Sequence, residues 1–216
     1  MSAKQPHEIL AENDPERMGT LVAAVGPLEL PPFREPFFAL ARSIVGQQLS
    51  MAAASTIFDR LLALGDMEPE TLVALDEDEL RAVGLSRAKA GYLKDLAARV
   101  LDGRLDLAVL PSLPDDEVIA QVTEVRGIGR WSAEMFLIFA LNRPDVLALD
   151  DAGLLRAAGW LLGLGRPASR DELADAGERW RPYRSLASLY LWRAIGMGLV
   201  KWASPPEAPS AFGCRE

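Results

Sequence analysis

The chain has 216 residues, half of them hydrophobic, which is enough for a sizeable core in one body of one or two lobes. Its single cysteine, Cys214, excludes an intrachain disulfide, a zinc site made of cysteines and a four-cysteine iron–sulfur cluster. No apolar run approaches the roughly 18 residues of a membrane span, so we expect a cytoplasmic protein with no membrane partner. The formal net charge of −8 counts against tight non-specific binding of nucleic acid, although several arginines gather locally, namely Arg126, Arg130, Arg143 and Arg156.

Ala, Leu, Glu, Asp and Arg dominate the composition, and no long alternation of polar and apolar residues is present, so the sequence predicts an all-α protein. Apolar residues recur at helical spacing from Phe37 to Gly46, and after a polar break a second helical run reaches Leu64. Spacing and capping signals predict further helices over 77–83, 87–101, 115–124, 130–141, 152–161, 169–180 and 184–200.

Two of the predicted helix–turn–helix units resemble each other at an offset of 43 residues, the distance from Gly84 to Gly127. Residues 83–90 (VGLSRAKA) align with residues 126–133 (RGIGRWSA), and both segments join two helices by a tight turn. A solenoid needs about three units, so one repeat indicates a reused helix–hairpin–helix element instead.

The second turn, Gly127-Ile128-Gly129, is rich in glycine, which permits positive φ and removes side chains. Backbone N–H groups and the start of the next helix can then approach a phosphate. This glycine pattern occurs about as often in an ordinary connection between two helices as in a phosphate-binding turn. The second copy and the flanking Arg126 and Arg130 favour contact with DNA.

Residues 125–133, followed by Asp150-Asp151, resemble the hairpin and catalytic aspartate of the helix–hairpin–helix DNA glycosylases. Further segments that resemble the 3-methyladenine glycosylase II branch are 44–50, 80–86 and 180–192, so the match covers roughly residues 35 to 202 in order. The resemblance implies a monofunctional enzyme of base excision repair that flips an alkylated base, of the 3-methyladenine or 7-methylguanine type, out of double-stranded DNA and hydrolyses its N-glycosidic bond. We expect the protein to act as a monomer.

The fold implied by the resemblance is all-α, with two helical lobes around a central cleft and without the N-terminal β domain of the best-known bacterial relative. We expect one lobe to span 36–146 and to carry the hairpin at 125–129. The other lobe is expected to combine 1–35 with 147–216 and to carry the catalytic aspartate. Asp151 and Trp192 are then expected to face Trp131 across the cleft.

Asp151 matches the catalytic aspartate of the family. A carboxylate in the first turn of a helix is held ionised by the partial positive charge of the N-terminus, so it can stabilise an oxocarbenium-like sugar and orient a water. Asp150 is expected to act only as the helix cap. Bifunctional relatives carry a nucleophilic lysine where this chain has Trp131, so we expect no Schiff base. We also expect no cofactor for catalysis.

By the same resemblance, Trp192 stacks on the flipped base and Trp131 lines the same pocket, which suits a cationic, alkylated purine. Met135 stands where the bacterial relative has a tyrosine, so a roomier and less polar pocket is expected and the range of bases stays open. Gln48 and Leu49 are the predicted wedge pair, of which one fills the gap left by the flipped base.

The hairpin residues predicted to bind a DNA phosphate are Gly127, Ile128, Gly129 and Arg130. The resemblance further implies that the backbone carbonyls of Thr123, Val125 and Ile128 hold a monovalent cation, Na⁺ or K⁺, beside that phosphate.

Two alternatives remain open from the sequence. The chain could be a non-catalytic helix–hairpin–helix DNA-binding module, in which Asp151 is merely a cap. It could also be a glycosylase of the same fold that acts on uracil, hypoxanthine or an oxidised base.

Overall fold

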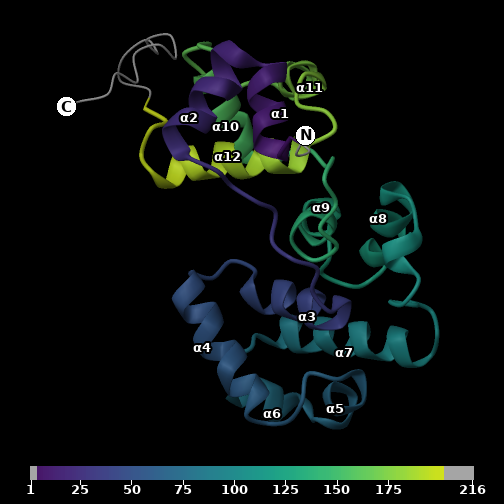
Figure 1. Cartoon of the computed structure of the whole chain (residues 1–216). Coiled ribbons are helices and arrows are strands. Elements are labelled where there is room, and N and C mark those ends of the chain that lie inside the picture. Colours follow the sequence, from purple (N-terminus) through teal and green to yellow (C-terminus); the bar gives the residue numbers. More distant parts are fainter. Residues whose placement is uncertain (1–3, 202–216) are drawn as a thin grey trace. The chain divides into compact units, whose positions relative to one another are not determined.

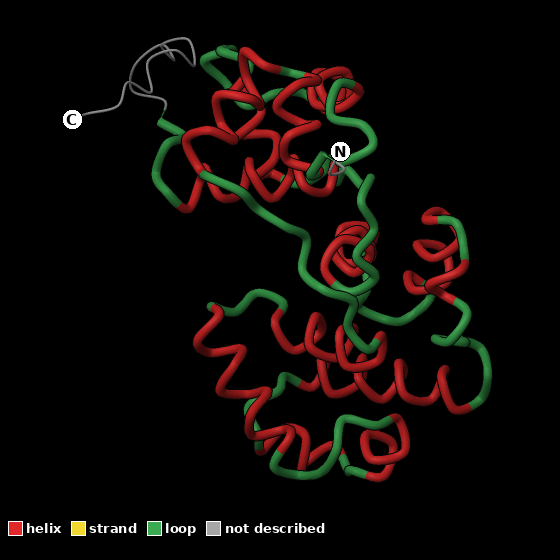
Figure 2. Tube along the Cα trace, viewed as in Figure 1, coloured by secondary structure: helices red, strands yellow, loops and turns green. Residues whose placement is uncertain are grey.

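The computed structural model describes residues 4–201, and Cys214 lies outside them. Within this range the regular structure is entirely helical (Figures 1 and 2), which confirms the predicted all-α class. None of the described helices is both long and apolar enough to cross a membrane.

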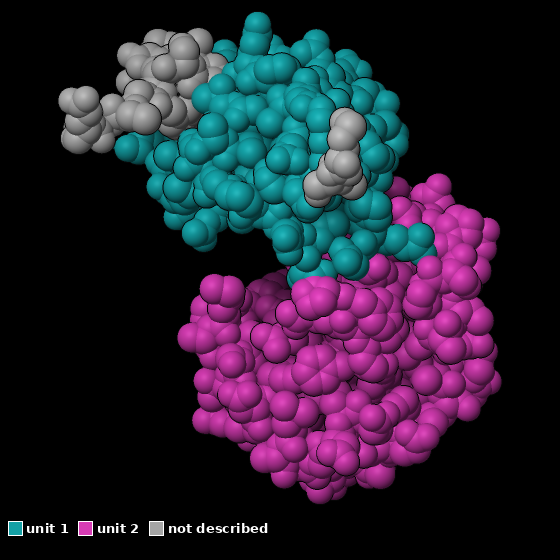
Figure 3. All heavy atoms as spheres, viewed as in Figure 1, with its two compact units in different colours: residues 1–31, 142–216 teal, residues 32–141 magenta. Residues whose placement is uncertain are grey.

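The chain forms two compact units, coloured separately in Figure 3. One comprises Met1–Pro31 and Asn142–Glu216, and the other is the continuous segment Pro32–Leu141. The sequence predicted 36 and 146 as the boundaries of the continuous lobe. We call the continuous segment the central unit and the other the terminal unit.

The central unit is built around α7 (Arg87–Leu101), which contacts α3, α5 and α6. Its buried face includes Leu93, Leu96 and Ala97. The other helical segments of this unit are α3 (Pro36–Gly46), α4 (Met51–Leu62), α5 (Pro69–Ala74), α6 (Glu77–Ala82), a 3-10 turn at Leu110–Ser112, α8 (Asp115–Thr123) and α9 (Arg130–Phe139). The short α5 was not predicted, because its surroundings are acidic and only Pro69 and Leu72 of its six residues are buried.

The terminal unit is built around α12 (Arg184–Gly196), which contacts α1, α2 and α10. The other helical segments of this unit are α1 (Pro6–Asn13), a π-helical turn at Pro15–Gly19, α2 (Thr20–Val25), α10 (Ala152–Leu161) and α11 (Arg170–Glu178). The Tyr190 hydroxyl donates to the carbonyl of Gly26 at 3.0 Å and accepts from the Leu28 N–H at 3.1 Å. These hydrogen bonds hold the segment after α2 against α12.

Candidate active site

Asp151 lies directly before α10 and caps it. Its Oδ1 accepts a hydrogen bond from the Leu154 backbone N–H at 2.6 Å, and the residue is only 9% exposed. The indole Nε1–H of Trp192, on α12, donates to the same oxygen at 3.1 Å. The structure therefore brings together two predicted site residues that lie 41 positions apart, and two donors fix the orientation of one carboxylate.

The expectation that Asp150 caps the helix is wrong. A turn closed by the Asp151 N–H on the Ala148 carbonyl, at 3.1 Å, carries the chain one residue further before α10 begins. Asp150 instead accepts a hydrogen bond from Arg170 Nη1 at 2.6 Å, and both of these side chains are about half exposed. The two neighbouring aspartates thus have distinct environments.

Gly153, in the first turn of α10, leaves space beside the Asp151 carboxylate. A Cβ atom at this position would lie 3.0 Å from Asp151 Oδ1 and 3.5 Å from a ring carbon of Trp192. Sequence reasoning missed this residue. The available signal was a glycine early in a helix, where it costs about 1 kcal/mol relative to alanine and so indicates a requirement for space.

The second helix–turn–helix unit, α8 to α9, contains the predicted hairpin. Gly127 has φ +85°, and a Cβ atom there would overlap the Tyr92 ring of α7. The first unit, α6 to α7, has a glycine in the matching place, Gly84, with φ +110°. Gly129 differs from the expectation, because its φ of −93° and ψ of 175° are extended backbone that any residue adopts. Of the two hairpin glycines, only Gly127 has a backbone conformation that favours glycine.

Asp95 of α7 anchors the start of the hairpin. Its Oδ2 accepts from the Arg126 backbone N–H at 2.9 Å and from Arg99 Nε at 3.1 Å. Burial alone raises the pKa of this carboxyl, but the Arg126 N–H and the Arg99 guanidinium outweigh it and hold the pKa below its usual value.

Both arginines of the hairpin are paired with carboxylates of the same unit. Arg130 Nε lies 3.1 Å from Oε1 of the buried Glu134, and Arg126 Nε lies 3.4 Å from Asp95 Oδ1. Their charges are therefore largely balanced within the protein. The backbone N–H groups at the start of α9 suit a phosphate as well, and the Arg130 side chain stays largely exposed beside them.

Two predicted pocket residues share one face of α9. Trp131 is 48% exposed and Met135 is half-buried, and they lie one helical turn apart. Phe139 continues the same row and is also exposed. Sequence reasoning missed Phe139, although its spacing of four residues from Met135 was a readable signal.

The predicted wedge lies in the loop between α3 and α4. Gln48 has φ +57°, an uncommon conformation for a residue with a side chain, and both it and Leu49 are exposed. Ser50 caps α4 by accepting from the Ala53 N–H at 3.3 Å, and Met51, the first residue of that helix, is 91% exposed. Sequence reasoning missed Met51, an exposed apolar side chain beside the wedge pair.

The three carbonyls expected to hold a cation belong to the end of α8 and the hairpin. Thr123 is the last residue of α8, and the Val125 carbonyl accepts from the Ile128 N–H at 3.1 Å, so the loop is curled. Carbonyl oxygens are ligands that hard cations prefer, and the C-terminal end of a helix carries partial negative charge. The donor set therefore fits Na⁺ or K⁺.

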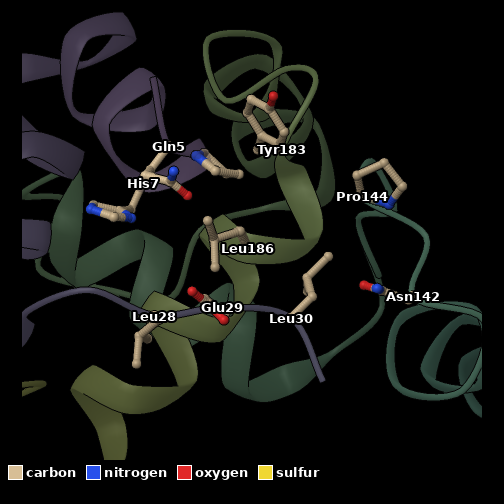
Figure 4. Close-up of a pocket in the computed structure, with 10 residues that line it drawn as sticks. Gln5, His7, Leu28, Glu29, Leu30, Asn142, Pro144, Tyr183 and Leu186 are labelled. Carbon is tan, nitrogen blue, oxygen red and sulfur yellow. The ribbon is translucent and has the colours of Figure 1, made fainter. Parts of the chain in front are cut away.

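The terminal unit also contains a pocket of about 320 Å³ (Figure 4). It lies between the start of α1, the segment after α2 and the start of α12, and its polar lining includes His7, Glu29 and Tyr183. None of its lining residues is a predicted site residue. The pocket is thus separate from the Asp151 and Trp192 pair.

Comparison with known proteins decides the family. The profile described as HhH-GPD superfamily base excision DNA repair protein matches residues 41–182, which include both helix–turn–helix units and Asp151. The chain belongs to this HhH-GPD superfamily.

Similar proteins agree with this assignment. The Bacillus subtilis protein YfjP, provisionally named a DNA-3-methyladenine glycosylase, is 34% identical over 72% of this chain, and the match spans 58% of that relative's length. A solved DNA-3-methyladenine glycosidase of Bacillus halodurans is 38% identical with a TM-score of 0.83, over 94% of this chain and 95% of that one. The solved Schizosaccharomyces pombe 3-methyladenine DNA glycosylase, in complex with abasic DNA, is 31% identical with a TM-score of 0.78, over 89% and 97%. The predicted helix–hairpin–helix glycosylase fold is confirmed.

Proposed function

We propose that the protein is a monofunctional DNA glycosylase that excises alkylated purines, of the 3-methyladenine and 7-methylguanine type, from double-stranded DNA. The observation that carries the proposal is the buried Asp151 carboxylate, held at the start of α10 by the N–H groups of Leu154 and Trp192. The names of its relatives, and the abasic DNA bound to one of them, support the same activity.

In this mechanism Asp151 stabilises the positive charge that develops on the sugar as the base leaves, and it orients the attacking water. Alkylation at a ring nitrogen makes the purine cationic and a good leaving group, so the site needs aromatic faces more than a strong acid. Trp192 stacks on the flipped base, while Trp131 and Met135 of α9 line its pocket. The chemistry uses water and the protein's own groups, with no cofactor.

The remaining predicted residues bind DNA. Gln48 or Leu49 fills the gap left by the flipped base, and the exposed Met51 lies next to them as an additional apolar contact. Backbone N–H groups of the hairpin, together with Arg130, bind a phosphate of the DNA. The enzyme acts as a monomer.

The cation belongs to this same DNA-binding element. The carbonyls of Thr123, Val125 and Ile128 would hold Na⁺ or K⁺ beside the phosphate, where the positive charge would attract the DNA backbone.

Release of free base from a methylated duplex tests this proposal against a non-catalytic DNA-binding module. Wild-type protein should release 3-methyladenine or 7-methylguanine, detected by chromatography, and leave abasic sites in the DNA. A protein that binds the duplex but releases no base would be a binding module, with Asp151 acting only as a cap.

The reaction should leave no covalent intermediate. Where bifunctional relatives carry a nucleophilic lysine this chain has Trp131, so incubation with lesion DNA and borohydride should trap no adduct on a denaturing gel. The product strand should stay intact until it is treated with alkali. A trapped adduct would contradict the monofunctional mechanism and would require an amine nucleophile elsewhere in the chain.

Substitution of Trp192 should separate stacking from positioning. Trp192→Ala removes the ring and its Nε1–H, and each stacking contact is worth about 1–3 kcal/mol, so excision of 7-methylguanine should slow at least about fivefold. Neutral hypoxanthine should lose less, because cation–π attraction contributes only for the charged base. Trp192→Phe keeps a ring but loses the hydrogen bond to Asp151, so an intermediate rate is expected. Equal losses on charged and neutral bases, measured in single turnovers, would mean that Trp192 only shapes the pocket.

A further inference from the structure

The loop that carries the predicted wedge is held by both helix–turn–helix units. From the first unit, Lys89 Nζ donates to the carbonyls of Val45 at 2.8 Å and Gln47 at 2.6 Å. Gln47, which belongs to the loop itself, donates from Nε2 to the carbonyl of Gly127 in the second helix–turn–helix unit at 2.7 Å. Segments 80 positions apart in the chain thus meet at a loop of a few residues.

The Lys89 contact closes the end of α3. That helix ends at Gly46, so its last carbonyls have no partner within the helix and carry partial negative charge. The ammonium group satisfies two carbonyls at this point, and such charge-assisted hydrogen bonds are stronger than neutral ones. The α3 and α7 helices lie side by side in the central unit (Figure 1), so the Lys89 side chain has a short distance to span.

One face of α7 supports the wedge loop and the hairpin together. Lys89, Tyr92 and Asp95 follow one another at intervals of three residues, which places them along the same side of the helix. Lys89 holds the wedge loop, the Tyr92 ring lies against Gly127, and Asp95 accepts from the Arg126 N–H. A single rigid helix therefore sets the spacing between the loop and the hairpin.

We propose that Lys89 and Gln47 are positioning residues for base flipping, which fix the wedge loop at a set distance from the phosphate-binding hairpin. This inference rests on the proposed function, because the wedge must enter the duplex while the hairpin holds its backbone. A misplacement of about 1 Å can cost about 100-fold in an enzyme that depends on geometry, so loosening this clamp should impair flipping.

The test compares Lys89→Met with Lys94→Met. Both substitutions remove an ammonium group from α7, but Lys94 reaches the Val73 carbonyl at 3.5 Å, away from the wedge loop. Gln47→Ala removes the contact to the hairpin, and Lys89→Arg retains a cation that can reach the same carbonyls. Each variant is assayed in single turnovers on 7-methylguanine opposite cytosine and on the same lesion opposite an abasic site, where flipping breaks no base pair. Thermal unfolding is measured in parallel.

Lys89→Met should slow excision from the paired duplex about tenfold or more, and from the lesion opposite the abasic site less than about threefold. Gln47→Ala should show the same pattern, Lys89→Arg should recover part of the lost rate, and Lys94→Met should match wild type. Equal losses on both substrates, accompanied by a lower unfolding temperature, would make Lys89 a stabilising residue only. Unchanged rates on both substrates would also overturn the proposal.

A fluorescent base separates this proposal from the proposed function. 2-Aminopurine placed next to the lesion brightens when its neighbour unstacks, whether or not the glycosidic bond is cleaved. A wild-type protein that excises nothing would overturn the proposed function, yet a wild-type rise in fluorescence that Lys89→Met reduces would still support the clamp. The absence of any difference between these two proteins would reject it.

Discussion

Asp151→Asn is expected to abolish base excision while leaving the fold intact. The N–H groups of Leu154 and Trp192 both donate to Asp151 Oδ1, and an asparagine amide oxygen can accept the same two hydrogen bonds. Asparagine and aspartate are comparable helix caps, so the free energy of unfolding should change by less than about 1 kcal/mol. The negative charge that stabilises the developing sugar cation is lost, and the single-turnover rate should fall by about 1,000-fold or more.

Asp150→Asn is the matched control, because it makes the same chemical change one residue away. Asp150 is about half exposed and paired with Arg170, and such surface pairs contribute little. Its excision rate should stay within about threefold of wild type, and both variants should bind lesion DNA within a few fold of wild type. Near wild-type excision by Asp151→Asn would refute the catalytic role and leave Asp151 as a cap alone.

Gly127→Ala should have the largest effect on stability. The methyl group would overlap the Tyr92 ring, and the residue would be forced to keep a positive φ. Together these effects should lower the free energy of unfolding by about 2 kcal/mol or more, measured by denaturant titration. The hairpin should be displaced, so DNA binding should weaken as well.

Gly129→Ala tests the phosphate contact without disturbing the fold. This glycine has extended backbone, and a Cβ atom there would meet nothing within 4 Å. The cost in stability should be under about 1 kcal/mol, the usual value for an altered helix cap. If a phosphate approaches this backbone, the methyl group should weaken duplex binding about tenfold. Unchanged binding by Gly129→Ala would place the phosphate contact elsewhere.

The sequence predicted those parts of the fold that depend on local patterns. The helices from α3 to α12 carry apolar residues at helical spacing or clear caps, apart from the short α5. The two matching turns follow from glycine positions that local conformation requires, Gly84 and Gly127. Family membership, inferred from motifs in the right order, is confirmed by the profile match.

The helices α1 and α2 were not predicted, because their stability depends on contacts far along the chain. Leu10 and Leu21 are fully buried, yet they pack in the unit built around α12, which begins at residue 184. Short segments with few apolar residues carry little periodic signal of their own. The formation of α1 and α2 therefore depends on long-range packing.

The candidate site shows the same division between local and long-range information. Asp151 was singled out by its resemblance to the family's catalytic aspartate, whereas the choice between Asp150 and Asp151 as the helix cap depended on one turn of the chain. The bond from Trp192 to Asp151 and that from Gln47 to Gly127 join distant segments, and no local pattern indicates them. The roles of these residues in excision stay predictions.

A panel of duplexes that each contain one lesion tests the central claim most directly. Single-turnover rates of wild-type protein would be measured on 7-methylguanine, 3-methyladenine, hypoxanthine, uracil and an oxidised purine in the same sequence context. The Trp192 ring and the single carboxylate of Asp151 suit a cationic leaving group, so both methylated purines should be excised at least tenfold faster than any neutral base. A preference for uracil or for the oxidised purine would contradict the assignment to alkylated bases.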